Sequence, residues 1–322
     1  MRKIAVYDNF TEPKHRQCID ETAAKYGFTV DYYAAPESVP AEKRGEYEVI
    51  YGMPKPGELK DFVNLKWFCG SFAGVDAYLD EGLYPSPEVM LSNSSGAYGV
   101  TIAEHMIMVT LMLLRHAGTY CADQTAGRWG QVLPMRSIIG STITVLGTGD
   151  IGTEFARRAK ALGAKCIRGV RRTKKAADPA FDEIHTNDEL DGLLADTDIL
   201  AMALPATGET RGILSAERIA RLPQTAYVVN VGRGSAIDQA ALIDALNGGR
   251  IAGAALDVFQ TEPLPQGDPA WTAKNLLITP HISGQMSLGY TRDRNVELFC
   301  EDLERYGRGE KPVRLVDRKI GY

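Results

Sequence analysis

The chain has 322 residues, of which 36 are basic and 41 acidic, so it is mildly negative and gives no support for a nucleic-acid or anionic-membrane partner. Its length suffices for two domains with separate cores. The longest apolar stretch, residues 102–114, is shorter than the roughly 18 residues that suggest a membrane span. Five scattered cysteines without ligand-type spacing predict reduced thiols, no metal site and a cytoplasmic location.

The first hundred residues alternate strand-like and helix-like runs, which predicts a parallel sheet with helices on both faces. A segment with turn-type residues, Ser71–Asp76, follows the last of these strands, at the edge where open α/β sheets bind ligands. An ordinary turn is an equal alternative for Gly74. The predicted elements are strands at 3–7, 29–33, 48–51 and 67–70 and a helix at 14–26.

The segment 92–99 is rich in turn-forming residues and is a candidate domain crossing. The helix that begins near Thr101 is apolar almost all round, which predicts burial between domains or against another subunit. We interpret His105 and His116, on and just after this helix, as structural.

A second α/β set begins near Ser141, and its six predicted strands suit a doubly wound nucleotide-binding fold. A further helix is predicted near 295–306, and residues 312–322 show no clear pattern. The six strands are predicted at 142–146, 164–170, 199–204, 226–231, 251–258 and 276–279.

The first strand of this set leads into a glycine-rich turn followed by helical spacing, the pattern of a dinucleotide-binding site. Gly147 permits the tight turn, Gly149 lets a pyrophosphate approach the backbone, and Gly152 lets helix and strand pack closely. The alternative is a tight turn without a ligand. The candidate cofactor-binding residues of this turn are Gly147, Thr148, Gly149, Asp150, Ile151 and Gly152.

Three polar residues follow the last three predicted strands of the second domain: Arg233, Glu262 and His281. Each has an ordinary interpretation, as a solvated loop charge, a surface acid before proline and a helix-capping histidine. Because all three strand ends face the crevice where the nucleotide is expected, together they indicate a catalytic site.

Several ordered motifs make the chain resemble the D-isomer-specific 2-hydroxyacid dehydrogenase family over essentially its whole length. The matching segments are Gly74-Val75-Asp76, Gly147–Gly152, Leu204-Pro205 with Glu209–Gly212, Asn230–Gly234, Leu256–Phe259 with Glu262–Leu264, and Thr279-Pro280-His281.

The resemblance implies a role for each candidate residue. Arg233 would hold a 2-oxo acid, His281 would protonate its carbonyl, and Glu262 would orient the imidazole. Backbone N–H groups around Ala73 and Gly74 would bind the substrate carboxylate, so the substrate-binding set is Ala73, Gly74, Arg233 and His281. Asp257 would contact the nicotinamide carboxamide, and the remaining cofactor contacts would be Leu204, Pro205, Thr210, Val231, His281 and Gly284.

The family pattern also implies a Rossmann dinucleotide-binding domain inserted into a flavodoxin-like substrate domain. The substrate-binding domain would comprise 1–98 plus 291–322 and the dinucleotide-binding domain 99–290, with hinges near Gly99 and Gly289. In relatives the helix near 101–114 belongs to a twofold interface, which implies a homodimer.

The end of the second strand of this domain indicates the cofactor. Enzymes that use NAD usually carry an acid there, whereas this chain has Val170 followed by Arg171-Arg172-Thr173-Lys174-Lys175. We predict no carboxylate at this position and expect Arg171 and Arg172 to pair with a 2′-phosphate, so NADP(H) is preferred and NAD(H) remains possible. A solvated basic loop is the alternative.

The leading hypothesis is an NADPH-dependent oxidoreductase that transfers a hydride to a small 2-oxo acid and gives a D-2-hydroxy acid, as a glyoxylate/hydroxypyruvate reductase does. A phosphoglycerate dehydrogenase is the nearest alternative enzyme, although we find no additional cationic site for a phosphorylated substrate. A nucleotide-sensing binding protein, like corepressors that share this fold, is the alternative from another class.

Overall fold

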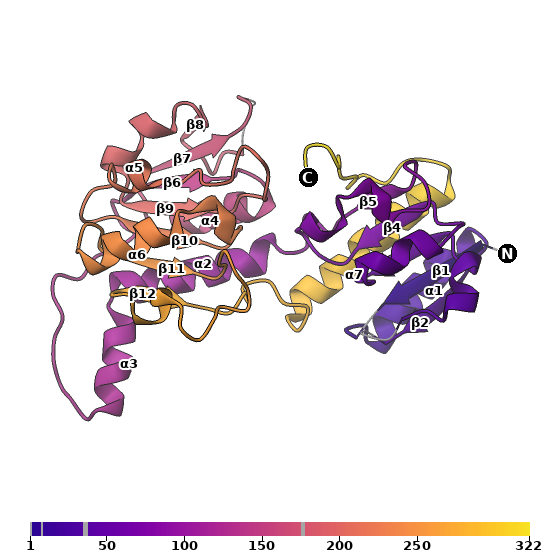
Figure 1. Ribbon diagram of the computed structural model, residues 1–322, viewed down its shortest axis with the longest axis horizontal. Coiled ribbons are helices and arrows are strands. Elements are labelled where there is room, and N and C mark those ends of the chain that lie inside the picture. The colour runs from indigo at the N-terminus through magenta and orange to yellow at the C-terminus, as the bar shows by residue number, and fades with distance from the viewer. Residues whose placement is uncertain (1, 8, 35–37, 175–177) are drawn as a thin grey trace. The chain divides into compact units, whose positions relative to one another are not determined.

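The chain divides into two units, each built around its own parallel sheet. The computed structural model describes residues 2–7, 9–34, 38–174 and 178–322 (Figure 1). Unit 1 consists of Met1–Tyr98 and Gln285–Tyr322, and unit 2 of Gly99–Gly284. The sequence predicts a domain boundary at residue 290, and the compact units divide after Gly284, before the last helix, α7 (Gly289–Gly307).

Unit 1 contains a five-stranded sheet in the order β2-β1-β3-β4-β5, with every neighbouring pair parallel. This is the flavodoxin-like order, as predicted. The strands are β1 (Arg2–Tyr7), β2 (Phe28–Tyr33), β3 (Val49–Gly52), β4 (Trp67–Gly70) and β5 (Met90–Ser92), and α1 spans Pro13–Lys25.

The two faces of this sheet are covered differently. On one face, α1 and α7 contribute Ile19, Phe299 and Leu303 to a cluster with the buried Trp67. The Tyr51 and Phe299 rings stack there with their centroids 4.0 Å apart. On the other face the cover comes from short 3-10 turns, η1 (Ala41–Glu46), η2 (Pro56–Asp61), η3 (Asp76–Tyr78) and η4 (Glu81–Leu83).

Unit 2 contains a seven-stranded parallel sheet in the order β12-β11-β10-β9-β6-β7-β8. The order reverses between β6 and β9, which is the topological switch point where Rossmann folds bind nucleotides. The strands are β6 (Thr142–Leu146), β7 (Cys166–Arg171), β8 (Glu183–Thr186), β9 (Ile199–Met202), β10 (Tyr227–Asn230), β11 (Gly253–Leu256) and β12 (Leu276–Ile278).

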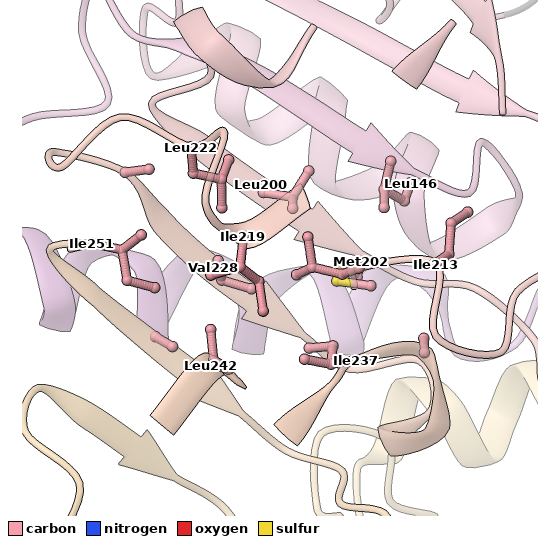
Figure 2. Packing of buried hydrophobic residues seen from close by; sticks show 14 of the residues in the cluster. Leu146, Leu200, Met202, Ile213, Ile219, Leu222, Val228, Ile237, Leu242 and Ile251 are labelled. Carbon is pink, nitrogen blue, oxygen red and sulfur yellow. The ribbon is translucent and has the colours of Figure 1, made fainter. Parts of the chain in front are cut away.

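The core of unit 2 is built around the central strands β9, β10 and β11, in which every residue is buried. Leu200, Met202 and Val228 point to one face, where α5 (Ala216–Ile219) and α6 (Gln239–Asn247) supply Ile219 and Leu242 (Figure 2). The opposite face carries α2 (Gly99–Leu114) and α4 (Asp150–Ala161). Further short turns in this unit are η5 (Leu190–Gly192), η6 (Leu194–Asp196), η7 (Gly234–Ala236) and η8 (Pro269–Thr272).

Two strands are present that the sequence did not predict. The second sheet has seven strands rather than six, because Glu183–Thr186 forms β8 at its edge, with an exposed residue and no apolar run to mark it. In unit 1, β5 has only three residues and is extended by an antiparallel bridge from Ser92 to Leu315 in the C-terminal tail. Short edge strands of this kind are weak signals in a sequence.

Helix α2 is followed by α3 (Ala117–Thr125), which has no buried residue. In Figure 1, α3 and the loop after it extend away from the sheet of unit 2. No single helix in the described ranges is long and apolar enough to span a membrane; α2 and α3 reach that length only when counted together across their 69° bend.

Candidate active site

The glycine turn after β6 is tightly constrained at two positions. Gly147 has φ +97°, which an L side chain rarely adopts, and its N–H donates to Val170 O at 2.9 Å. A Cβ at Gly152 would lie 1.9 Å from the carbonyl oxygen of Gly147. The first turn of α4 therefore packs directly against the glycine turn, and no larger residue fits at 152.

Gly149 has the opposite environment, because a Cβ there would meet nothing within 4 Å. It is the N-cap of α4 and provides no side-chain cap, so the turn presents open backbone at the N-terminus of a twelve-residue helix. The neighbouring Asp150 carboxylate accepts from Gly99 N at 2.8 Å. The turn fits an anionic pyrophosphate at 149, while Asp150 joins the first turns of α2 and α4.

The other residues predicted to contact cofactor lie in loops next to this turn. Thr148 O accepts from Thr153 Oγ1 at 3.3 Å, and Ile151 is half-buried at the start of α4. After β9, Leu204 is buried and Thr210 Oγ1 donates to Pro205 O at 2.6 Å, which closes that loop. Val231, buried at the end of β10, donates its N–H to Met202 O at 3.0 Å, and Gly284 is half-buried.

The basic run lies at the end of β7, where Arg171 is the half-buried last residue of the strand and Arg172 is exposed. Lys175 lies outside the described residues. Lys174 Nζ is 3.5 Å from Glu189 Oε1, so a carboxylate from another segment pairs with this lysine, while the end of β7 itself carries no acid. The sequence did not predict this pair because Glu189 lies in the turn after β8, a strand that was not predicted.

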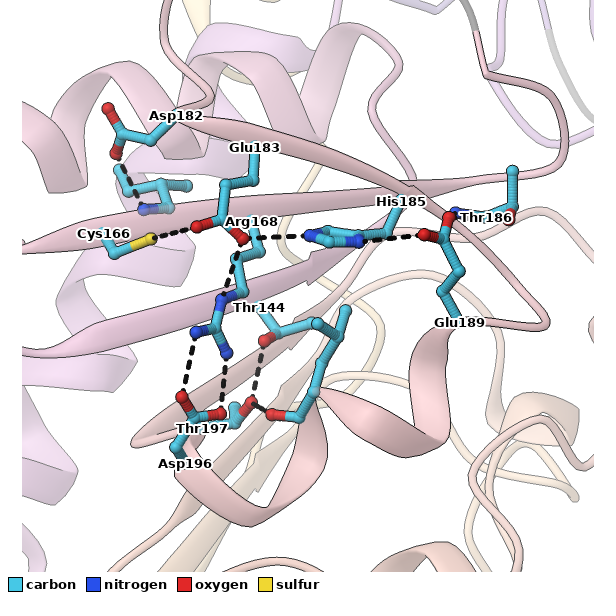
Figure 3. A network of polar contacts seen from close by, with 12 residues as sticks. Thr144, Cys166, Arg168, Asp182, Glu183, His185, Thr186, Glu189, Asp196 and Thr197 are labelled. Carbon is cyan, nitrogen blue, oxygen red and sulfur yellow. Dashed lines mark hydrogen bonds and ion pairs between the residues drawn. The ribbon is translucent and has the colours of Figure 1, made fainter.

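Glu189 is already engaged by its own loop (Figure 3). Its Oε2 accepts from Thr186 N at 2.8 Å and Thr186 Oγ1 at 2.9 Å, and these hydrogen bonds lower the pKa of Glu189 to about 2. His185 lies between Glu183 and Glu189, with ring nitrogen to carboxylate distances of 3.0 and 3.5 Å. The carboxylates at this edge are therefore held by β8 and its following turn.

Arg233 is placed by the turn after β10. Asn230 shapes this turn: its Nδ2 donates to Arg233 O and its Oδ1 accepts from Gly232 N, both at 3.0 Å. A Cβ at Gly234 would lie 2.0 Å from the carbonyl carbon of Phe259, so the loops after β10 and β11 are in close contact. Arg233 is half-buried, and its Nη1 donates to Gly232 O at 2.8 Å.

Glu262 and His281 lie side by side. Glu262 Oε2 is 2.6 Å from His281 Nδ1, and Glu262 Oε1 accepts from Phe259 N at 2.8 Å. A carboxylate can only accept, so Nδ1 carries the proton of this hydrogen bond, and Nε2 is the ring nitrogen that does not contact Glu262. The imidazole is 51% exposed and the carboxylate 33% exposed, so the pair is accessible.

Asp257 follows β11 and is 2% exposed, and its carbonyl oxygen accepts from His281 N at 2.8 Å. Its Oδ1 accepts from Thr279 Oγ1 at 2.6 Å and from Ile282 N at 3.0 Å, and its Oδ2 accepts from Ser283 N at 3.0 Å. The Ser283 side chain also donates to this carboxylate. Burial alone would raise the pKa of Asp257, but these hydrogen bonds outweigh it and lower the pKa below its usual value. The carboxylate predicted to contact nicotinamide is thus already engaged by the side chains of Thr279 and Ser283 and by two backbone N–H groups.

A family model for "D-isomer specific 2-hydroxyacid dehydrogenase, NAD binding domain" matches residues 107–283, more than half of the chain. The chain belongs to this family. It is accordingly an NAD(P)-dependent oxidoreductase that acts on CH–OH groups, and the predicted fold class, two parallel-sheet α/β units, is confirmed.

Named relatives of this dehydrogenase cover most of its length. A glyoxylate reductase from Korarchaeum cryptofilum is 31% identical over 72% of this chain and 70% of the relative. A D-isomer specific 2-hydroxyacid dehydrogenase from Xanthobacter autotrophicus, solved with NADPH and MES, is 31% identical with a TM-score of 0.81 and covers 99% of both chains. An NADPH-dependent glyoxylate/hydroxypyruvate reductase from Sinorhizobium meliloti, solved with NADP and sulfate, is 25% identical with a TM-score of 0.82 and covers 100% of both chains.

Within unit 1 of the dehydrogenase, Ala73 and Gly74 follow β4 as predicted. Asn93 Nδ2 donates to Ala73 O at 2.7 Å, and Ser94 N donates to Phe72 O at 2.9 Å. Gly74 is exposed and Ala73 half-buried, so this loop is fixed by its carbonyl groups. Among the described residues, no group of three His, Cys, Asp or Glu side chains is arranged to hold a metal ion.

Several residues that shape the site received no role from the sequence. Asn230 and Thr279 lie inside the recognised motifs, but only their hydrogen bonds show what they do. Ser283 binds Asp257 through both its backbone N–H and its side chain. His105, interpreted as structural, has its Nε2 3.3 Å from Thr279 Oγ1.

Proposed function

We propose that this dehydrogenase is an NADPH-dependent reductase of small 2-oxo acids, of the glyoxylate/hydroxypyruvate reductase kind, that produces D-2-hydroxy acids. The observation that carries the proposal is the pairing of His281 Nδ1 with Glu262 at 2.6 Å, beside the loop of Arg233 at the ligand-binding edge of a Rossmann sheet. The names of the relatives described above support the substrate class.

The roles of the three side chains follow from their chemistry. NADPH, when bound, supplies the hydride that reaches the carbonyl carbon of the substrate. His281 donates the proton from Nε2 to the carbonyl oxygen, while Glu262 holds Nδ1–H and stabilises the imidazolium before transfer. Arg233 binds the substrate carboxylate and carbonyl oxygen with its planar, permanently charged group. In the oxidation direction His281 accepts the proton.

The residues present fit a dinucleotide. The open backbone at Gly149 and the N-terminus of α4 would hold the pyrophosphate, with Leu204, Pro205, Thr210 and Val231 beside it. Arg171 and Arg172 at the end of β7 would pair with the 2′-phosphate, which favours NADPH over NADH. The NADPH- and NADP-bound relatives support this preference.

The two units take separate parts in this proposal. Unit 2 is the dinucleotide-binding domain, and unit 1 is the substrate-binding domain, in which backbone N–H groups of Ala73 and Gly74 bind the substrate carboxylate. The crossings near Gly99 and at Gly284 to Gly289 act as hinges. We place the enzyme in the cytoplasm because all five cysteines are free, including Cys18 and Cys300 with their sulfur atoms 3.5 Å apart.

We also propose a homodimer formed through α2, α3 and the loop 126–140. This arm exposes large apolar side chains that a monomer would leave in water, among them Trp129 at 100%, Ile139 at 74% and Leu133 at 69%. Sedimentation should give twice the chain mass for the wild type and the monomer mass for Trp129→Ser/Leu133→Ser. A wild-type monomer would overturn the dimer.

The substrate class is tested by following NADPH oxidation with glyoxylate, hydroxypyruvate, pyruvate, phenylpyruvate, 2-oxoisocaproate and 3-phosphohydroxypyruvate, with NADH in parallel. Turnover on one or two unphosphorylated acids is expected. Turnover confined to 3-phosphohydroxypyruvate would instead favour a phosphoglycerate dehydrogenase. Tight NADPH binding without turnover on any compound would overturn the reductase in favour of a nucleotide-sensing protein.

A further inference from the structure

His105 and Thr279 form a hydrogen-bonded chain that ends on the buried carboxylate of Asp257. His105 Nε2 is 3.3 Å from Thr279 Oγ1, and Thr279 Oγ1 is 2.6 Å from Asp257 Oδ1. The three residues come from α2, from the end of β12 and from the end of β11. A helix on one face of the sheet is thereby connected to the two strand ends that carry the candidate acid and its partner.

The number of available protons decides which group donates in each of these two hydrogen bonds. The Thr279 hydroxyl has one hydrogen, and the carboxylate of Asp257 can only accept, so that hydrogen points to Asp257. Thr279 Oγ1 must therefore accept from His105, which places a proton on Nε2 of that ring. Burial lowers the pKa of His105, partly offset by the charge of Asp257, so the neutral ring with Nε2–H is favoured.

Asp257 in turn fixes the backbone that carries His281. Its two oxygens accept from Ile282 N and Ser283 N, and its carbonyl oxygen accepts from His281 N at 2.8 Å. His281 has φ +50°, a left-handed conformation that is unfavourable for a residue other than glycine. Such a conformation persists only where surrounding contacts hold it.

We propose that His105 and Thr279 are positioning residues that orient Asp257 and so hold the 281–283 backbone in the conformation that presents His281. The proposal rests on the proposed role of His281 as the acid. Without the donor at His105 the Thr279 hydroxyl is free to rotate away from Asp257, and the carboxylate then loses one of its two side-chain donors.

The first test reads the protonation of His105 directly and does not depend on activity. Histidine-selective ¹⁵N labelling gives ring signals from only five histidines, and His105→Leu identifies the signal of interest. In the wild type near neutral pH, His105 should have a protonated Nε2 and an unprotonated Nδ1. A protonated Nδ1 with bare Nε2, or a rapid average of the two forms, would overturn the proposal.

The second test measures the backbone and the chemistry together. Thr279→Val should speed hydrogen exchange at the Ile282 and Ser283 amides and lower kcat about tenfold, with KM for NADPH nearly unchanged. Thr279→Ser keeps the hydroxyl and should restore both. Thr110→Val is the matched control. The Thr110 hydroxyl on α2 donates to Met106 O at 2.6 Å and takes no part in the hydrogen bonds that link His105, Thr279 and Asp257.

These outcomes separate the proposal from the function on which it rests. Unchanged amide exchange and kcat in Thr279→Val, or a Ser variant as impaired as the Val variant, would show that the hydroxyl positions nothing. If the wild type turns over no 2-oxo acid, the reductase assignment fails. The tautomer of the His105 ring and the exchange of the Ile282 and Ser283 amides still decide whether His105 and Thr279 orient Asp257.

Discussion

On the two sides of the switch point in the nucleotide-binding sheet, the charged side chains are held to different degrees. After β10, β11 and β12, Arg233, Glu262 and His281 are fixed by backbone contacts, close loop packing and the buried Asp257. After β7, Arg171 and Arg172 lie on a more open strand end. Proton transfer depends on geometry to a fraction of an ångström, whereas attraction between a phosphate and an arginine tolerates movement.

The largest loss is expected from His281→Gln, which removes the only proposed proton donor. We expect kcat to fall by about two to four orders of magnitude, while NADPH affinity hardly changes. Stopped-flow reduction and a fluorescence titration with NADPH measure the two quantities. His116→Gln is the control, because the His116 ring contacts Pro134 O through Nε2 and has no part in the proposed chemistry. A normal rate in His281→Gln would mean that another group supplies the proton.

A smaller loss is expected from Glu262→Gln, which keeps the shape of the pair but removes the negative charge beside Nδ1 of His281. Losing one charge-assisted hydrogen bond should lower kcat/KM about ten- to hundredfold. Steady-state kinetics with NADPH and the best 2-oxo acid measure it. A Glu262→Asp variant with partial activity would strengthen the interpretation, and full activity in the Gln variant would contradict it.

The arginines after β7 should affect the choice between NADPH and NADH and leave the rate of the catalytic step unchanged. In Arg171→Ala/Arg172→Ala, the ratio of kcat/KM for NADPH to that for NADH should fall about ten- to hundredfold, since a charge-assisted contact contributes roughly 1.5–3 kcal/mol. The NADH value should change little. Arg157→Ala, which removes a charge paired with Glu154 and Asp178 on the surface, should leave the ratio unaltered. A wild type that prefers NADH would refute the assignment.

The smallest expected effect is on the stability of the folded protein in acid, through Asp257. Because the pKa of Asp257 is lower in the folded chain than in the unfolded one, its ionised form stabilises the fold above about pH 4, and that contribution is lost as pH falls through the folded pKa. Asp257→Asn should therefore lower the free energy of unfolding by about 1.5 kcal/mol at neutral pH. Urea unfolding should show this difference shrinking in acid; an equal difference at both pH values would contradict it.

The sequence predicted the central strands of both sheets well, because buried parallel strands read as short apolar runs. It did not predict β8, whose Glu-Ile-His-Thr sequence has no such run, and with it the position of Glu189 beside Lys174 was missed. It also gave α7 a later start, although the helix begins at Gly289.

For the candidate site, the motifs predicted which strand ends carry Arg233, Glu262 and His281, since the order of the strands follows from the α/β alternation. Their distances were not accessible, because they depend on how loops pack, as where Gly234 meets Phe259. His105 illustrates the difference. A histidine on an apolar helix is ordinarily structural, and only the fold brings it within 3.3 Å of Thr279.

The sequence by itself determined the class of fold, the glycine turn and the family, because hydrophobic periodicity and ordered motifs are local properties of the chain. Only the tertiary structure decided which atoms meet: the tautomer of His281 opposite Glu262, the burial of Asp257 among its hydrogen-bond donors, and the apolar arm left exposed around Trp129. These depend on contacts between residues far apart in the chain, and no local pattern encodes such distances.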